Sequence, residues 1–383
     1  MDDGRRRMTG RRALDEAILP TLTALLVALV AGDLLILSYG QAPGAVWRLM
    51  LDGTWGNAYG IGQVLYKATT LTCTGLAVAV GLRAGLFNIG AESQLAAGGF
   101  CAAMMALLVP PAFGPIVAVP LCIVAAALGG AAVGFVPGLL RARFGAHEVI
   151  ATIMLNFVVL ALLNWVMASG GLAVPETLHT RATPHAAVPR LASVFDAFHG
   201  SAANFTIVVA VLLTLVIAWL LFRTRLGYEL RAVGLQPAAA ENGGIRVPRT
   251  WLVAMVLSGA IAGIGGTNFV LGYKTYYEDG FAGGAGFLGI AVTLVGRNHP
   301  LGVVLAALFF ATLSQGGLAI HALVPKQMVE VLEGVVILAV ATSVPEVRRL
   351  LRMRPRTGAP AAPVAAPVTP PATAGAASTT VRG

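Results

Sequence analysis

The chain contains nine runs of about 20 mostly apolar residues, each bounded by charged residues, Pro or Gly. They are residues 18–39, 64–82, 86–109, 116–140, 149–168, 205–222, 251–272, 301–320 and 328–344. A run of this length crosses the hydrocarbon core of a bilayer as one α-helix. Hydrophobic residues make up 57% of the chain and charged residues only 11%, against about 25% in soluble domains. Since no globular core hides so much apolar surface, the sequence predicts an all-α integral membrane protein and excludes a soluble one.

A tenth apolar run, residues 284–296, is only 13 residues long. Such a run is typical of a tilted, re-entrant or broken helix. An odd number of spans would place the two Arg-rich ends of the chain on opposite sides of the membrane. Ten spans place 20 of the 26 basic residues, and both ends, on the cytoplasmic side, as the positive-inside rule requires. We therefore predict about ten transmembrane helices.

This topology divides the chain into three parts. Residues 1–17 form a basic cytoplasmic N-terminus, residues 18–344 the transmembrane domain, and residues 345–383 an Arg-rich, disordered Ala/Pro cytoplasmic tail. The domain has a periplasmic loop at about 170–203 and a cytoplasmic loop at about 223–250. The periplasmic loop holds three of the six His, but their spacing fits no metal-ligand motif, so no metal site is predicted.

The net charge of +9 follows from the same topology. Its basic residues are concentrated in cytoplasmic segments, where they set the orientation and contact anionic lipid headgroups. Membrane lipids are therefore expected partners, and no nucleic acid is.

The cytoplasmic loop contains one short surface helix. Pro237 is a typical first helical residue, three Ala and Glu241 follow it, and Gly243 ends the pattern. A rigid helix between two spans can transmit force. Taken alone, the pattern is also typical of an ordinary Arg-rich inner loop.

Three further segments accompany this loop in order. They are GLRAGLFNIGAESQLAAGGF at 81–100, HEVIATIMLNFVVLALLNW at 147–165 and GFLGIAVTLVGRNHPLGVVLAAL at 286–308. Together the four segments resemble the permease subunit of bacterial ABC importers of the ribose, simple-sugar and nucleoside type, over roughly residues 66–344. The GLFNIGAESQ and IATIMLN strings are most similar to the nucleoside branch.

The resemblance implies a type II ABC importer permease fold and several partners. These are an ABC ATPase subunit with two ATPase domains, a second homologous permease that forms a heterodimer, and an extracytoplasmic substrate-binding lipoprotein. ATP and Mg²⁺ would be bound by the partner ATPase, with no cofactor in this chain. By resemblance, the surface that couples to the ATPase consists of Arg231, Gly234, Pro237, Ala239, Glu241, Gly244 and Ile245.

The sequence agrees with this division of labour on one point. A phosphate-binding loop needs a Gly-rich turn that ends in Lys followed by Ser or Thr. Of the three Lys, only Lys274 precedes a Thr, and it lacks the upstream Gly pattern. We therefore predict a permease subunit without its own ATPase motif, and not an enzyme.

Polar residues inside the apolar runs are the candidates for a substrate path, because burying an amide or carboxylate in hydrocarbon is costly. The candidates are Asn88, Glu92, Gln94, Asn156 and Asn164. In the alternative interpretation, which is at least as good for any one of them, these groups tie helices together. Glu330 and Glu333, near the outer end of the last run, are expected in the headgroup region.

The predicted protein is thus a multi-pass permease of the bacterial inner membrane with both termini cytoplasmic. It would form half of a pore and import a nucleoside or simple sugar by alternating access, driven by ATP. The alternative is a secondary transporter driven by an ion gradient, which needs ionisable groups deep in several spans. Glu92 is the one good candidate for such a relay.

Overall fold

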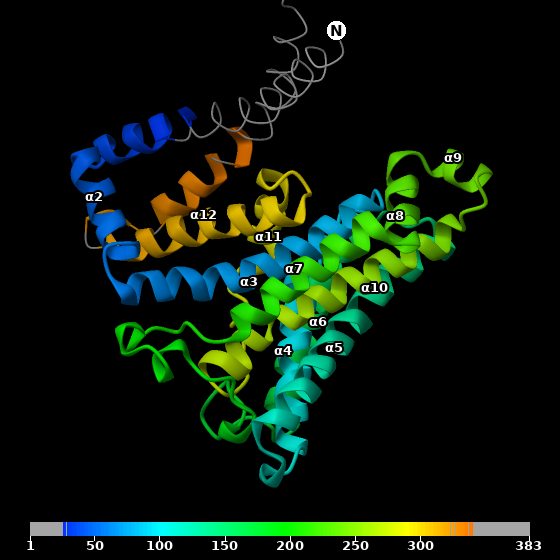
Figure 1. Cartoon of the computed structure of the whole chain (residues 1–383), viewed down its shortest axis with the longest axis horizontal. Coiled ribbons are helices and arrows are strands. Elements are labelled where there is room, and N and C mark those ends of the chain that lie inside the picture. Colours follow the sequence, from blue (N-terminus) through cyan, green and yellow to red (C-terminus); the bar gives the residue numbers. More distant parts are fainter. Residues whose placement is uncertain (1–25, 28, 322, 326, 336, 340–383) are drawn as a thin grey trace, which may run out of the picture.

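The computed structural model describes residues 26–27, 29–321, 323–325, 327–335 and 337–339 (Figure 1). Within these residues seven helices are long and apolar enough to cross a membrane. They are α3 (Ala58–Arg83), α4 (Ala91–Leu108), α5 (Gly114–Phe144), α6 (Glu148–Ser169), α7 (Thr206–Arg223), α10 (Val247–Gly265) with its π-helical extension Asn268–Tyr273, and α12 (Pro300–Ala319). The described residues contain isolated β-bridges but no sheet. The predicted all-α membrane fold is confirmed.

The predicted count of ten spans is approximate. The first run continues into a bent pair, Leu29–Ser38 and α2 (Pro43–Thr54), whose axes differ by 111° and which counts as at most one span. The chain turns at Gly40, whose φ is +72°, and α2 then begins at Pro43. The last run is helical in 327–335 and 337–339. The predicted N-terminus 1–17 and tail 345–383 lie outside the described residues.

Glycines bring α5 and α10 into direct backbone contact. A Cβ added at Gly130 would lie 2.1 Å from the carbonyl oxygen of Gly259, and one at Gly259 would lie 2.3 Å from that of Gly130. Gly134 and Gly263 extend the contact by one turn in each helix. Both helices therefore carry small residues four apart, a pattern that lets membrane helices approach until their backbones touch.

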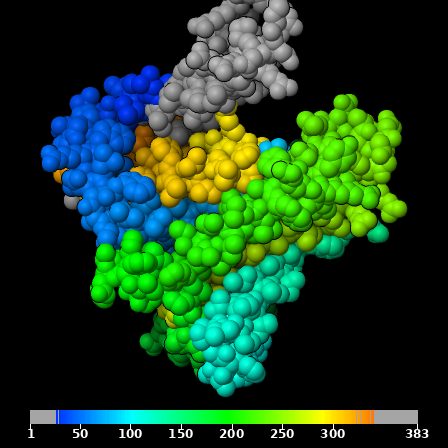
Figure 2. Space-filling view, viewed as in Figure 1, coloured from blue at the N-terminus to red at the C-terminus, as the bar shows by residue number. Residues whose placement is uncertain are grey.

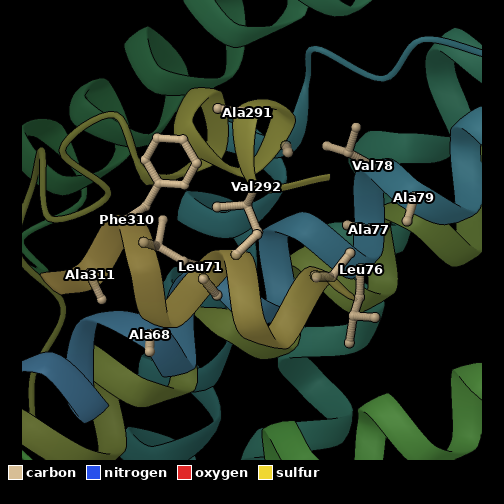
Figure 3. Close-up of a cluster of buried hydrophobic side chains, with 14 of the residues drawn as sticks. Ala68, Leu71, Leu76, Ala77, Val78, Ala79, Ala291, Val292, Phe310 and Ala311 are labelled. Atoms are coloured by element: carbon tan, nitrogen blue, oxygen red, sulfur yellow. The ribbon is translucent and has the colours of Figure 1, made fainter. Parts of the chain in front are cut away.

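Helix α3 lies at the centre of the bundle. Its most apolar 18 residues are 78% buried, whereas those of α6 are 22% buried. Figure 3 shows Leu71 of α3 close to Val292 of α11 (Ala285–Val295) and Phe310 of α12, and all three side chains are buried. The helices in contact with α3 thus define the core, and α6 presents most of its surface outward.

The two ends of the bundle differ (Figure 1). At one end α7 leads into the short helices α8 (Arg225–Leu235) and α9 (Pro237–Asn242), which precede α10 and protrude from the body in Figure 2. At the other end, α6 and α7 are joined by a loop with three 3-10 helices, Pro184–Ala186, Leu191–Ser193 and Asp196–Phe198. We call these the coupling end and the loop end.

Candidate functional site

The polar residues of the 81–100 motif hold a non-helical segment, residues 84–90, that precedes α4 inside the bundle. Asn88 is fully buried; its amide donates to Ser258 Oγ (2.7 Å) and Gln94 Oε1 (2.8 Å), and its Oδ1 accepts from the Gly90 N–H (2.9 Å). Asn156 of α6 donates to the Ile89 carbonyl (3.0 Å). Since an unpaired backbone group is costly away from water, these side chains make the irregular segment tolerable.

Glu92 does the same for a second irregular segment, which precedes α11. Its two carboxylate oxygens accept the backbone N–H groups of Gly284 (2.8 Å) and Gly286 (2.7 Å), and the residue is 6% exposed. Gly284 is the N-cap of α11, with φ +85°. The carboxylate therefore pairs two of the orphan donors that a helix start leaves, and it opposes the positive end of the helix dipole.

This second segment connects the two ends of the bundle. The Asp279 N–H donates to the Leu178 carbonyl at the loop end (2.9 Å). After α11, the Arg83 guanidinium donates through Nη2 and Nε to the Asn298 carbonyl (2.7 and 3.1 Å) at the C-terminal end of α3. Residues 279–298 thus run from end to end, although α11 has only 11 residues. A broken helix is one of the three forms that the short tenth run predicts.

The structure separates the predicted path residues into two places. Asn88, Glu92, Gln94 and Asn156 are buried together around the two irregular segments. Asn164 is exposed on α6, where its amide donates to Asp279 Oδ2 (2.7 Å). A substrate path along these residues stays a prediction. The hydrogen bonds of the four buried side chains favour the alternative, in which they tie helices together.

A cavity of about 570 Å³ lies between α3, the π-helix, α11, α12 and the helix that contains 327–335. Its aromatic lining consists of Tyr66, Phe269, Phe281 and Phe287, and its polar lining includes Lys67, Thr70, Ser314, Glu330 and Glu333. None of the five predicted path residues is among the described residues that line it. Glu330 and Glu333, which the sequence places at the headgroups, face this cavity.

The coupling end presents α9 on a small apolar base. Val233, Ala240 and Val247 are buried there against Ile245 and Trp251. The chain returns toward α10 through Gly244, whose φ of +82° favours glycine. Two of the predicted coupling residues, Arg231 and Ile245, are half-buried. The other five are exposed: Gly234, Pro237, Ala239, Glu241 and Gly244. The adjoining Leu235, which was not selected from the sequence, is 87% exposed.

Phe222, the penultimate residue of α7, links this end to α3 and α12. The Arg83 and Arg231 guanidinium groups lie 5.5 and 5.6 Å from the centre of its ring, and the His299 ring stacks on it at 5.4 Å. We call these four residues the Phe222 cluster. It joins α8 to the turn between α11 and α12, because Arg83 also holds the Asn298 carbonyl.

Sequence comparison identifies the architecture. The profile of one protein family, described as branched-chain amino acid transport system / permease component, matches residues 60–341. The chain belongs to this permease family. It is 34% identical over 333 residues to the guanosine ABC transporter permease protein NupP of Bacillus subtilis, covering 85% of this chain and 93% of that protein.

Two further relatives are named for different substrates. The glucose ABC transporter permease protein TsgB13 of Haloferax volcanii is 34% identical over 340 residues, covering 85% of this chain and 87% of that protein. A second guanosine ABC transporter permease protein of Bacillus subtilis, NupQ, is 28% identical over 253 residues, covering 64% of this chain and 79% of that protein. The chain is therefore a permease subunit of an ABC importer, and the alternative of a secondary transporter is not favoured.

For this permease, the motifs that carried the family resemblance are those that hold broken helices together. The aromatic and acidic cavity was missed, because its lining is drawn from helices between Tyr66 and Ile337 that no local sequence pattern connects. One feature of the sequence could have indicated an acidic cavity wall: Glu330 and Glu333 are three residues apart and share a helix face.

Proposed function

We propose that this permease imports nucleosides, working as one half of a heterodimeric pore. Its partners are an ABC ATPase subunit with two ATPase domains, a second homologous permease and a substrate-binding lipoprotein. The two Bacillus subtilis relatives, NupP and NupQ, are both named as guanosine permeases of one strain, and this supports a nucleoside substrate and a paired permease. The glucose permease keeps a simple sugar as the second candidate.

The observation that carries the coupling role is the exposed helix α9 on its buried base. Coupling needs a surface that protrudes yet moves with the spans. α9 is joined through α8 to α7, and Val247 at the start of α10 packs beneath it. In this proposal α8, α9 and both termini face the cytoplasm, and closure of the ATPases on ATP moves α9.

Movement of α9 then reaches the spans through the Phe222 cluster. Arg231 belongs to α8, whereas Arg83 and His299 belong to α3 and to the turn before α12. A displacement of α8 therefore acts on both sides of the central helix. This arrangement provides a physical route for alternating access between the two ends of the bundle.

The test compares Ala239→Arg on α9 with Ala112→Arg, a substitution of the same type at an exposed site far from α9. We expect Ala239→Arg to abolish uptake of labelled guanosine by cells that contain the complete importer, and Ala112→Arg to retain it. Purified complexes should show the same contrast in ATP hydrolysis stimulated by the guanosine-loaded binding protein. Equal uptake by the two variants would refute the coupling role, and uptake of glucose but not guanosine would refute the nucleoside assignment.

A further inference from the structure

The cavity between α3, the π-helix and α12 has the size and lining of a small-molecule site. Its volume of about 570 Å³ lies within the roughly 300–1,000 Å³ of typical ligand pockets. Tyr66 and Lys67 lie near the start of α3, and the Phe222 cluster lies at its other end. The cavity is therefore in the half of the bundle remote from the coupling end.

One wall of the cavity is aromatic and held in place from behind. Phe269 lies in the π-helix and stacks on Phe281 at 4.8 Å. The preceding residue, Asn268, is 1% exposed; its amide donates to Thr70 Oγ1 (2.9 Å) and its Oδ1 accepts from Thr206 Oγ1 (2.7 Å). Buried bonds to two other helices fix the backbone that carries Phe269. A pre-positioned ring offers a planar solute a stacking surface.

The polar groups of the cavity favour hydroxyl and amino groups over anions. Among the described residues of the lining, Glu330 and Glu333 contribute two carboxylates and Lys67 one ammonium, which donates to Ser314 Oγ (3.2 Å). Carboxylates accept hydrogen bonds from hydroxyl groups and repel phosphate. The start of α11, which lines the cavity at Gly284 and would otherwise attract an anion, is already paired by Glu92.

We propose that this cavity is a solute chamber for an uncharged solute with a planar ring and hydroxyl groups, such as a nucleoside, and that it rejects the phosphorylated forms. The ring lies against Phe269, and the hydroxyl groups face Ser314, Glu330 and Glu333. The proposal rests on the proposed import function and adds to it a location and a charge filter within the permease itself.

The first test probes the charge filter with a cysteine. A Cβ added at Gly334, in the chamber lining, meets no atom within 4 Å, so Gly334→Cys fits. The three native cysteines, Cys73, Cys101 and Cys122, are replaced by Ala. Gly44→Cys in α2 is the matched control, since it is equally unobstructed and lies outside the lining. Membranes containing the complete importer are treated without ATP with a cationic or an anionic methanethiosulfonate.

We expect the ratio of cationic to anionic labelling rates to be about tenfold higher at position 334 than at position 44, because two of the three charged side chains in the described lining are carboxylates, and a negatively charged cleft concentrates cations. Uridine should slow labelling at 334 and uridine 5′-monophosphate should not, while neither affects position 44. Equal ratios at the two positions overturn the charge filter. Absence of protection by uridine, or equal protection by its monophosphate, overturns the chamber.

The second test probes the stacking wall in the Gly334→Cys chain. Phe269→Leu should raise the uridine concentration needed for half protection about tenfold, in line with the energy of base–aromatic stacking, and Phe269→Tyr should restore it. Phe309→Leu, outside the lining, is the control for loss of a ring elsewhere. Equal protection in the Leu and Tyr variants of Phe269 overturns its role. The labelling ratio at position 334 is measured with Phe269 unchanged. The first test therefore remains valid even if Phe269→Leu fails to fold.

The outcome is separable from that of the proposed function. If Ala239→Arg abolishes guanosine uptake but uridine does not protect position 334, the importer assignment stands and the chamber falls. If uridine protects position 334 while Ala239→Arg leaves uptake intact, the chamber stands and the coupling role falls.

Discussion

The carboxylate of Glu92 accepts the backbone N–H of Gly286 at 2.7 Å, and this bond joins α4 to α11 across 194 residues of sequence. Its other oxygen accepts the N–H of Gly284, the N-cap of α11. A buried acidic group in a transmembrane run is commonly a functional candidate. Here the Glu92 carboxylate accepts hydrogen bonds from two backbone N–H groups at the start of α11, which have no acceptor in the preceding turn.

Removing the Glu92 acceptors should destabilise the protein. Glu92→Leu leaves the two N–H groups unpaired at about 1–3 kcal/mol per buried group, whereas Glu92→Gln keeps one acceptor. The apparent melting temperature in detergent should therefore fall in the order wild type, Glu92→Gln, Glu92→Leu. Glu176→Leu, in the exposed loop, is the control and should melt with the wild type. A Glu92→Leu protein that melts with this control would contradict the capping role.

Gly286→Ala should push α11 away from α4. Its Cβ would lie 2.2 Å from the Glu92 nitrogen and 2.4 Å from its Cα, and neither backbone atom can move aside alone. Overpacking of this kind costs about 1–3 kcal/mol or more. Gly44→Ala is the helical control with open space and should be neutral or slightly stabilising. Melting in detergent checks both, and indistinguishable curves would refute the close packing.

Arg83→Lys should impair transport more than stability. Lys cannot reproduce the two donors that Arg83 directs at the Asn298 carbonyl, nor the planar group over Phe222. We expect guanosine uptake and stimulated ATP hydrolysis to fall severalfold with little change in melting temperature. Arg143→Lys, exposed at the end of α5, serves as the control. Full activity of Arg83→Lys would exclude the Phe222 cluster from coupling.

Tyr277→Phe should leave stability unchanged or raise it. The Tyr277 hydroxyl is buried beneath the loop and has no hydrogen-bond partner among the described residues. Burial raises its pKa, and the nearby Asp279 carboxylate raises it further. The folded state thus favours the protonated hydroxyl, so stability falls as pH rises above the ordinary pKa of about 10. Melting measured between neutral and alkaline pH should show a smaller decrease for Tyr277→Phe; a larger one would contradict this assignment.

Much of the fold was predictable because bilayer thickness translates directly into run length. The runs 149–168 and 301–320 became α6 and α12 within one residue at each end, whereas α3 begins at Ala58, before the predicted run 64–82. The run 86–109 was less accurate, since α4 begins only at Ala91. Hydropathy averages over a window, so it does not register that residues 84–90 obtain their hydrogen bonds from side chains and not from a helix.

The residue types of the candidate site were identifiable, but their tasks were not. The short helix at Pro237–Asn242 was predicted from Pro, Ala and Gly signals that act locally. Whether Asn88 lines a path or ties helices depends on Ser258, 170 residues away in the sequence. No local pattern contains that information.

The sequence by itself determined that this chain is a multi-pass permease, because apolar run length, basic-residue placement and loop motifs act over short stretches. Only the tertiary structure decided where Glu92 directs its charge and that Phe269, Ser314 and Glu333 meet around one cavity. The physical reason is that helix packing, set by glycine contacts such as that between Gly130 and Gly259, brings distant segments within hydrogen-bond reach. Those distances are properties of the packed bundle and of no single helix.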